Sequence, residues 1–149
     1  MKTIWDPHTY QEIVRRFESL QPNAQRQWGK MSVGQMLEHN SRVLEVVTGK
    51  RPMKQAFVGK LIGWIFKKRF LGEEPFGKNG PTGPDLIVID EPDFQETKAK
   101  VRNLLGNLYE MGEKGCNGKT HGFLGRLTGA EWGVIQYKHL DHHLRQFSA

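Results

Sequence analysis

Three of the six histidines in this 149-residue chain lie within one short stretch, YKHLDHHLRQF. They are His139, His142 and His143. At about 100° per residue in an α-helix, His139 and His143 project from the same face, one turn apart. Two imidazoles in this arrangement can reach a single metal ion. The spacing therefore indicates a divalent-metal site built on a helix.

A third histidine, His39, lies at the edge of the apolar face of another predicted helix. Two histidines from one helix and one from another give three nitrogen ligands. Such a set leaves coordination positions open for water or substrate, which is typical of a catalytic rather than a structural site. The alternative is that these histidines are core or boundary residues satisfied by hydrogen bonds. A pair of histidines four residues apart is by itself a weak motif.

Four amphipathic helices are predicted to position these side chains. The first covers roughly residues 7–20 after an Asp6-Pro7 start, and the second follows a Ser32 cap and ends at Gly49. The third covers roughly residues 93–113, and the last follows a Thr128-x-x-Glu131 capping box. On the last helix, one stripe is predicted to face the core and the opposite face to meet water. The stripe contains Trp132, Ile135, His139, His143 and Phe147, and the opposite face contains Lys138, Asp141 and Arg145.

The middle of the chain is less regular. The stretch AFVGKLIGWIFKKRFL fits a short extra helix, although Gly59 and Gly63 weaken it by about 1 kcal/mol each relative to alanine. GEEPFGKNGPTGPD predicts a long surface loop, LIVID a short extended segment and GCNGKTHGFLG a further loop. The sequence therefore predicts an all-α fold. Residues 1–149 would form one antiparallel four-helix bundle, with the long loop and the extra helix between its second and third helices.

Composition narrows the class of protein. Hydrophobic residues make up 37% of the chain, and the longest candidate for a membrane span, LIGWIF, is far too short. MKTIWDPHTY does not have the pattern of a signal peptide. The single cysteine, Cys116, cannot form an internal disulfide, and no base at a recognisable spacing would activate it as a nucleophile. These features predict a protein of the reducing cytoplasm without a transmembrane segment.

The positive charge is confined to one segment. Residues 50–78 hold eight basic and two acidic residues, a net charge of +6 that equals the formal net charge of the whole chain. Aromatic residues lie among the lysines, although Trp64 is expected to be a core residue. This basic segment supports an alternative function, a binding module for nucleic acid or an anionic membrane surface. No helix-turn-helix or other reading motif is present, so sequence-specific DNA binding is not expected.

Two stretches resemble a known superfamily. FESLQPNAQRQWGKMSVGQMLEHN and HGFLGRLTGAEWGVIQYKHLDHHLRQF resemble the DinB-like (YfiT-like) superfamily, and in particular a subfamily of uncharacterised bacterial domains. The resemblance implies a four-helix bundle with one divalent metal held by His39, His139 and His143, zinc or nickel being the expected ion. Many members end the motif as His-His-Arg-Gly-Gln, whereas this chain reads His-His-Leu-Arg-Gln from His142.

The resemblance also implies a function. It suggests a homodimer that acts on a small-molecule substrate, either by hydrolysis or by transfer of a low-molecular-weight thiol to an electrophile. No additional carboxylate stands at motif spacing to act as a hydrolytic base, which favours thiol transfer. His121, in THGFLG, is a candidate for proton handling or substrate contact, and its alternative is a loop histidine bonded to local backbone. Gln146 is a candidate for supporting the site.

Overall fold

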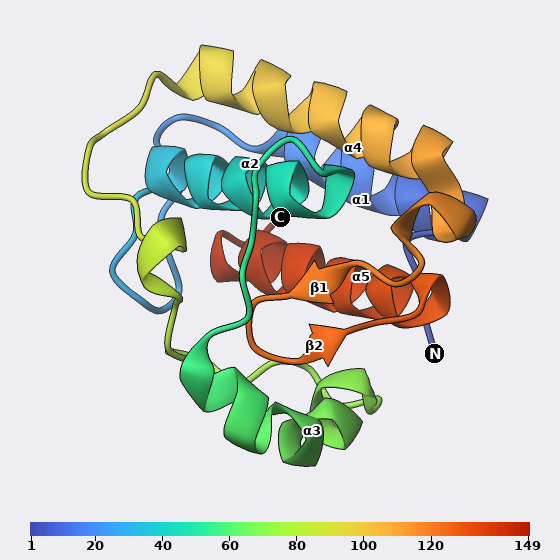
Figure 1. The fold of residues 1–149 in the computed structure, drawn as a ribbon. Coiled ribbons are helices and arrows are strands. Elements are labelled where there is room, and N and C mark those ends of the chain that lie inside the picture. The colour runs from blue at the N-terminus through green and yellow to red at the C-terminus, as the bar shows by residue number, and fades with distance from the viewer.

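The computed structural model describes residues 1–149, and it is mostly helical (Figure 1). The five α-helices are α1 (Pro7–Ser19), α2 (Val33–Thr48), α3 (Phe57–Leu71), α4 (Phe94–Cys116) and α5 (Gly129–Gln146). A 3-10 helix, η1 (Pro84–Leu86), lies between α3 and α4. Two short strands, β1 (Thr120–His121) and β2 (Gly125–Arg126), pair in antiparallel fashion before α5. The all-α class predicted from the sequence is confirmed.

The helix boundaries follow from local capping chemistry. Asp6 accepts a hydrogen bond from the backbone N–H of Thr9 at the start of α1. Ser32 and Thr128 each form a complete capping box, so the first turns of α2 and α5 are closed by side chains. Gly49 ends α2 in the left-handed conformation, with φ of 83°. These caps fix the register of the two helices that carry the histidines.

One hydrophobic core joins α1, α2, α4 and α5. It contains 21 buried residues, and α2 packs most extensively against α4. The contributions of the helices include Ile13 and Phe17 from α1, Leu37 and Leu44 from α2, Leu105 and Leu108 from α4, and Trp132 and Leu140 from α5. Figure 1 shows α3 at the periphery, on the far side of α5 from α4.

No helix combines the length and the apolar composition that a membrane span requires.

Two segments differ from their predicted structures. Part of the loop expected at residues 115–125 is the β1–β2 hairpin, and Cys116 is the buried last residue of α4. LIVID forms no strand, and its carbonyl groups bond instead to side chains of α2: Gln35 donates to the carbonyl of Ile89, and Arg42 donates to that of Ile87. This segment therefore lies against α2, and the carbonyl of Leu86 at its start contacts His39.

Candidate metal centre

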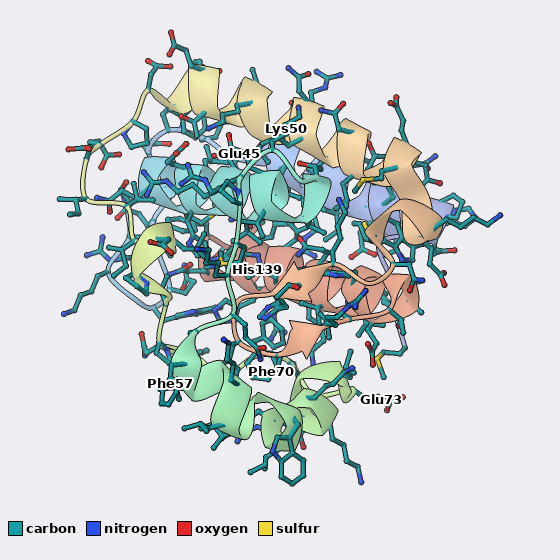
Figure 2. The ribbon with its side chains drawn as sticks, viewed as in Figure 1. Glu45, Lys50, Phe57, Phe70, Glu73 and His139 are labelled. Carbon is teal, nitrogen blue, oxygen red and sulfur yellow. The ribbon has the colours of Figure 1, made fainter.

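Three histidines from two helices meet inside the molecule. His39 lies in the middle of α2, and His139 and His143 lie one turn apart on α5. His39 and His143 are buried and His139 is half-buried. In Figure 2 the label of His139 lies in the middle of the view, between α3 and α4. One ligand atom from each ring lies within 4.8 Å of the others. The i, i+4 spacing and the single histidine of α2 thus converge on one point.

The closest approach in the cluster joins two ring nitrogens. Nε2 of His39 lies 3.0 Å from Nε2 of His139. The ring centroid of His143 lies 4.8 Å from that of His39 and 4.7 Å from that of His139. A tetrahedral zinc ion with N–Zn bonds of roughly 2.0–2.1 Å separates its ligand nitrogens by roughly 3.3 Å. The pair His39–His139 is close to this spacing, and the ligand atoms of all three rings lie within 4.8 Å of one another.

Outer hydrogen bonds fix the tautomers of two rings. Nδ1 of His39 lies 3.1 Å from the carbonyl oxygen of Leu86, which can only accept, so Nδ1 carries the proton. The amide of Gln146 donates from Nε2 to the carbonyl of Trp28 at 2.9 Å, which turns its Oε1 toward Nδ1 of His143 at 2.9 Å. His143 therefore also carries its proton on Nδ1. In both rings the lone pair stays on Nε2, as expected when an outer partner orients a metal ligand.

His139 lacks a complete set of partners. Its Nδ1 atom is buried and has no hydrogen-bond partner. Its Nε2 atom faces Nε2 of His39, which offers a lone pair and carries no proton. Because His39 and His143 direct their N–H groups outward, their two inward Nε2 lone pairs share at most the one N–H group that His139 can offer. A divalent cation held by the three Nε2 atoms would use all three lone pairs, and the three residues fit such an ion.

Burial keeps the three rings neutral. It lowers the pKa of His39, lowers that of His139 well below its ordinary value, and lowers that of His143 to about 3. Neighbouring imidazoles add to the effect, since a positive charge on one ring disfavours a charge on the next. Metal ligands must be deprotonated before they bind. At neutral pH the cluster is already in the required protonation state.

A family profile described as "Protein of unknown function (DUF1569)" matches residues 6–149. The chain belongs to this family. Among the curated proteins and the solved structures, none matches it. Membership of DUF1569 therefore assigns the chain to a family without assigning an activity, and the chemistry must be argued from the site itself.

A pocket of about 430 Å³ in this DUF1569 chain opens beside the cluster. Its wall includes His143, His142 and Gln146 of α5, together with the segment Trp28–Met31 and parts of the α3–α4 connection. Lys30 lines the pocket, and Lys78 places its Nζ 4.5 Å from the centroid of the Trp28 ring. No aspartate or glutamate lines this pocket. It joins a ring of the cluster to a cationic, carboxylate-free space large enough for a small molecule.

His121 lies in the β1–β2 hairpin and does not line the pocket. Its Nδ1 accepts hydrogen bonds from the backbone N–H groups of Phe123 and Leu124, both at 3.1 Å, and its ring packs on Trp132. Burial lowers its pKa to about 4. These contacts agree with the alternative hypothesis for His121, that of a loop histidine bonded to local backbone. Gln146, in contrast, directly orients His143.

The prediction that Lys138 lies on the face of α5 that meets water is wrong. Its side chain is buried, and Nζ donates to the carbonyls of Phe70 and Gly72 at 2.7 and 2.8 Å. These carbonyls lie at the C-terminal end of α3, where unpaired backbone acceptors attract a cation.

The sequence-based prediction of the metal site also did not include the backbone carbonyls of Leu86 and Trp28, which orient the site. Backbone acceptors in irregular segments leave no signal in residue types.

Proposed function

We propose that this DUF1569 chain is a metal-dependent enzyme of the DinB-like four-helix-bundle type. His39, His139 and His143 would hold one divalent ion. The observation that carries the proposal is the cluster of three neutral imidazoles in which His39 and His143 direct their Nε2 lone pairs inward. Imidazole ligands suit zinc and nickel, and these are the ions we expect. Three protein ligands leave a coordination position for a substrate group, as in catalytic sites.

The protein side chains would prepare the site rather than react themselves. The carbonyl of Leu86 and the amide of Gln146 hold the rings of His39 and His143 with Nε2 directed inward. The metal would supply Lewis acidity that lowers the pKa of a thiol or water near it. The pocket beside His143 would hold the substrate.

Between the two candidate reactions, the pocket favours thiol transfer. Hydrolysis benefits from a carboxylate base near the attacking water, and no carboxylate lines the pocket. In thiol transfer, a new S–C bond forms between the thiol and an electrophilic carbon. The leaving group departs with the electrons of its broken bond, and the thiol proton passes to water. Lys30 and Lys78 at the pocket favour an anionic low-molecular-weight thiol as the donor.

An activity panel tests this proposal. Metal-loaded protein would be supplied with small anionic and neutral thiols together with model electrophiles, and separately with simple esters and amides. We expect turnover in the thiol panel, higher with anionic thiols, and loss of turnover in His139→Ala. His8→Ala is the matched control, because His8 is an exposed histidine outside the cluster. Equal inactivity of loaded protein and His139→Ala across both panels would remove the enzymatic proposal. Turnover of esters or amides alone would replace thiol transfer by hydrolysis.

A further inference from the structure

Helix α3 exposes the side chains that an amphipathic helix ordinarily buries. Phe57, Leu61 and Trp64 are 74%, 59% and 72% exposed, and Val58 and Ile65 are each 55% exposed. At about 100° per residue, these five positions span a sector of roughly 120° on one side of the helix. Figure 2 shows Phe57 at the periphery of the molecule and Phe70 on the side of α3 nearer α5. We refer to these five residues as the outer face of α3.

The opposite side of α3 faces the hairpin, where Gly59 and Gly63 allow a close approach and Phe66 and Phe70 pack near Phe123. A Cβ atom on Gly59 or Gly63 would collide with the carbonyl oxygen of Phe123 in the hairpin. Gln55 donates to that same carbonyl at 3.1 Å, just before the helix begins. Only glycine permits this approach, and it directs the outer face of α3 away from the hairpin.

Polar contacts hold the other end of α3. Lys67 forms an ion pair with Glu131 of α5 at 2.8 Å. Lys138 of α5 binds the last carbonyls of α3. The helix is therefore anchored at both ends, and its outer face is a fixed feature of the surface rather than a loosely packed part of the core.

Basic residues surround the outer face. Lys60 flanks it on one side, Arg69 flanks it on the other, and Lys68 lies at its C-terminal end. Residues 57–71 contain no acidic residue, and the surrounding segment 50–78 has a net charge of +6 from eight basic and two acidic residues. Aromatic and aliphatic side chains on one face, with lysine and arginine around them, are typical of helices that lie in the interface of an anionic membrane. Each basic residue near such a surface contributes about 1 kcal/mol of attraction.

We propose that the outer face of α3 docks on anionic lipid membranes. The apolar side chains would enter the headgroup–acyl boundary, and the basic rim would contact lipid phosphates. A second copy of the chain is the less favourable occupant. A two-fold dimer would bring the same surface of each copy together and so oppose two segments of +6 charge.

Flotation with lipid vesicles tests the proposal. The native protein should float with vesicles of phosphatidylcholine and phosphatidylglycerol, bind weakly to phosphatidylcholine alone, and dissociate as salt is raised. Emission from Trp64 should shift to the blue on binding, and this shift should disappear in Trp64→Phe while binding persists. Failure of the native protein to bind anionic vesicles would overturn the proposal, and it would leave the metal site untouched.

Paired variants separate the apolar and the charged contributions. Leu61→Ser with Trp64→Ser should weaken vesicle binding by roughly tenfold or more, because two apolar side chains no longer enter the membrane. Ile89→Ser is the control, since Ile89 is 85% exposed but lies outside α3. Lys54→Glu with Lys60→Glu should also weaken binding by roughly tenfold or more. Arg15→Glu with Arg102→Glu is its control, with the same change in net charge on α1 and α4.

Other occupants of the outer face would give different results. A dimer in light scattering that Leu61→Ser with Trp64→Ser converts to monomer, without vesicle binding, would overturn the proposal in favour of self-association. Retention on nucleic acid that depends on Lys54 and Lys60 but not on Leu61 and Trp64, again without vesicle binding, would overturn it in favour of a nucleic-acid surface. Equal vesicle binding by the apolar double variant and the native protein would also contradict it.

Discussion

The histidine cluster and the outer face of α3 depart from ordinary side-chain burial in opposite directions. Between α2 and α5, three titratable rings lie inside, and one has a nitrogen without a partner. Along α3, five large apolar side chains lie outside. Neither arrangement is what folding alone favours. In each case contacts elsewhere hold the arrangement in place: capping boxes and outer hydrogen bonds for the histidines, and glycine packing for α3. We propose a ligand for each departure, a divalent cation inside and an anionic membrane outside.

Lowering the pH should reduce the free energy of unfolding, through the buried imidazoles, by more than any single substitution in α3 does. Burial lowers the pKa of His121 to about 4, whereas an exposed imidazole titrates near 6.5. As the pH falls below that higher value, the unfolded chain binds a proton that folded His121 does not. The free energy of unfolding of metal-free protein should therefore be constant above this window and fall within it, by roughly 3 kcal/mol from His121 alone.

Urea unfolding at several pH values between 7 and 4 measures this effect. His121→Asn keeps an acceptor for the two backbone N–H groups but does not titrate, so its stability should depend less on pH. His8→Asn should behave like the native protein, because His8 is exposed. Identical pH dependence in His121→Asn and the native protein would show that His121 is not a buried neutral base.

The glycine contact of α3 supplies the next largest effect. Gly63→Ala should destabilise the protein by about 2 kcal/mol, because the new Cβ must displace α3 from the carbonyl of Phe123. Gly106→Ala is the matched control in α4, where nothing lies within 4 Å of the added atom. It should stabilise the protein by up to about 1 kcal/mol. Denaturant melts of both variants provide the comparison, and equal shifts would contradict the close approach of α3 and the hairpin.

Lys138 links the two regions, because it lies beside His139 and binds the end of α3. Lys138→Met should cost about 1–2 kcal/mol, since the carbonyls of Phe70 and Gly72 lose their shared donor. Lys114→Met, at an exposed position of α4, should change stability by less than about 0.5 kcal/mol. Thermal melts measure both. A Lys138→Met variant as stable as the control would mean that this contact does not hold α3.

The smallest effect concerns the orientation of His143. Gln146→Ala should weaken metal binding by roughly tenfold, because His143 loses the acceptor that fixes its tautomer. Gln146→Glu keeps that acceptor but loses the donor to Trp28, so its affinity should exceed that of Gln146→Ala. Gln25→Ala, at an exposed position, is the control. Competition with a chromophoric chelator gives the affinities. Equal affinity in Gln146→Ala and native protein would exclude this supporting role.

The sequence predicted the parts of the molecule that depend on local chemistry. Ser32 was identified as an N-cap and Thr128 as the start of a capping box because such caps are short local patterns, and the stripe of α5 followed from helical periodicity. These two features together brought His39, His139 and His143 into one hypothesis. The resemblance then pointed to the same three residues as ligands of one divalent metal.

The remaining features depend on contacts between distant segments. Lys138 and Trp64 were both assigned to the wrong environment. Lys138 binds the last carbonyls of α3, and Trp64 lies on the side of α3 opposite its glycine contact with the hairpin. The β1–β2 hairpin was missed because strands of two residues carry no alternating pattern. The carbonyls of Leu86 and Trp28 orient the site from irregular segments. All of these features depend on tertiary packing, which the periodicity of residues in the sequence does not predict.

Metal content tests the central claim most directly. Protein purified without chelator and without a metal-binding affinity tag would be analysed by inductively coupled plasma mass spectrometry, then titrated with zinc and nickel. We expect one divalent ion per chain in native protein and in His8→Ala, and loss of stoichiometric binding in His39→Ala, His139→Ala and His143→Ala, with helical circular dichroism retained. Native protein that stays metal-free after titration, or full binding in all three cluster variants, would contradict the account.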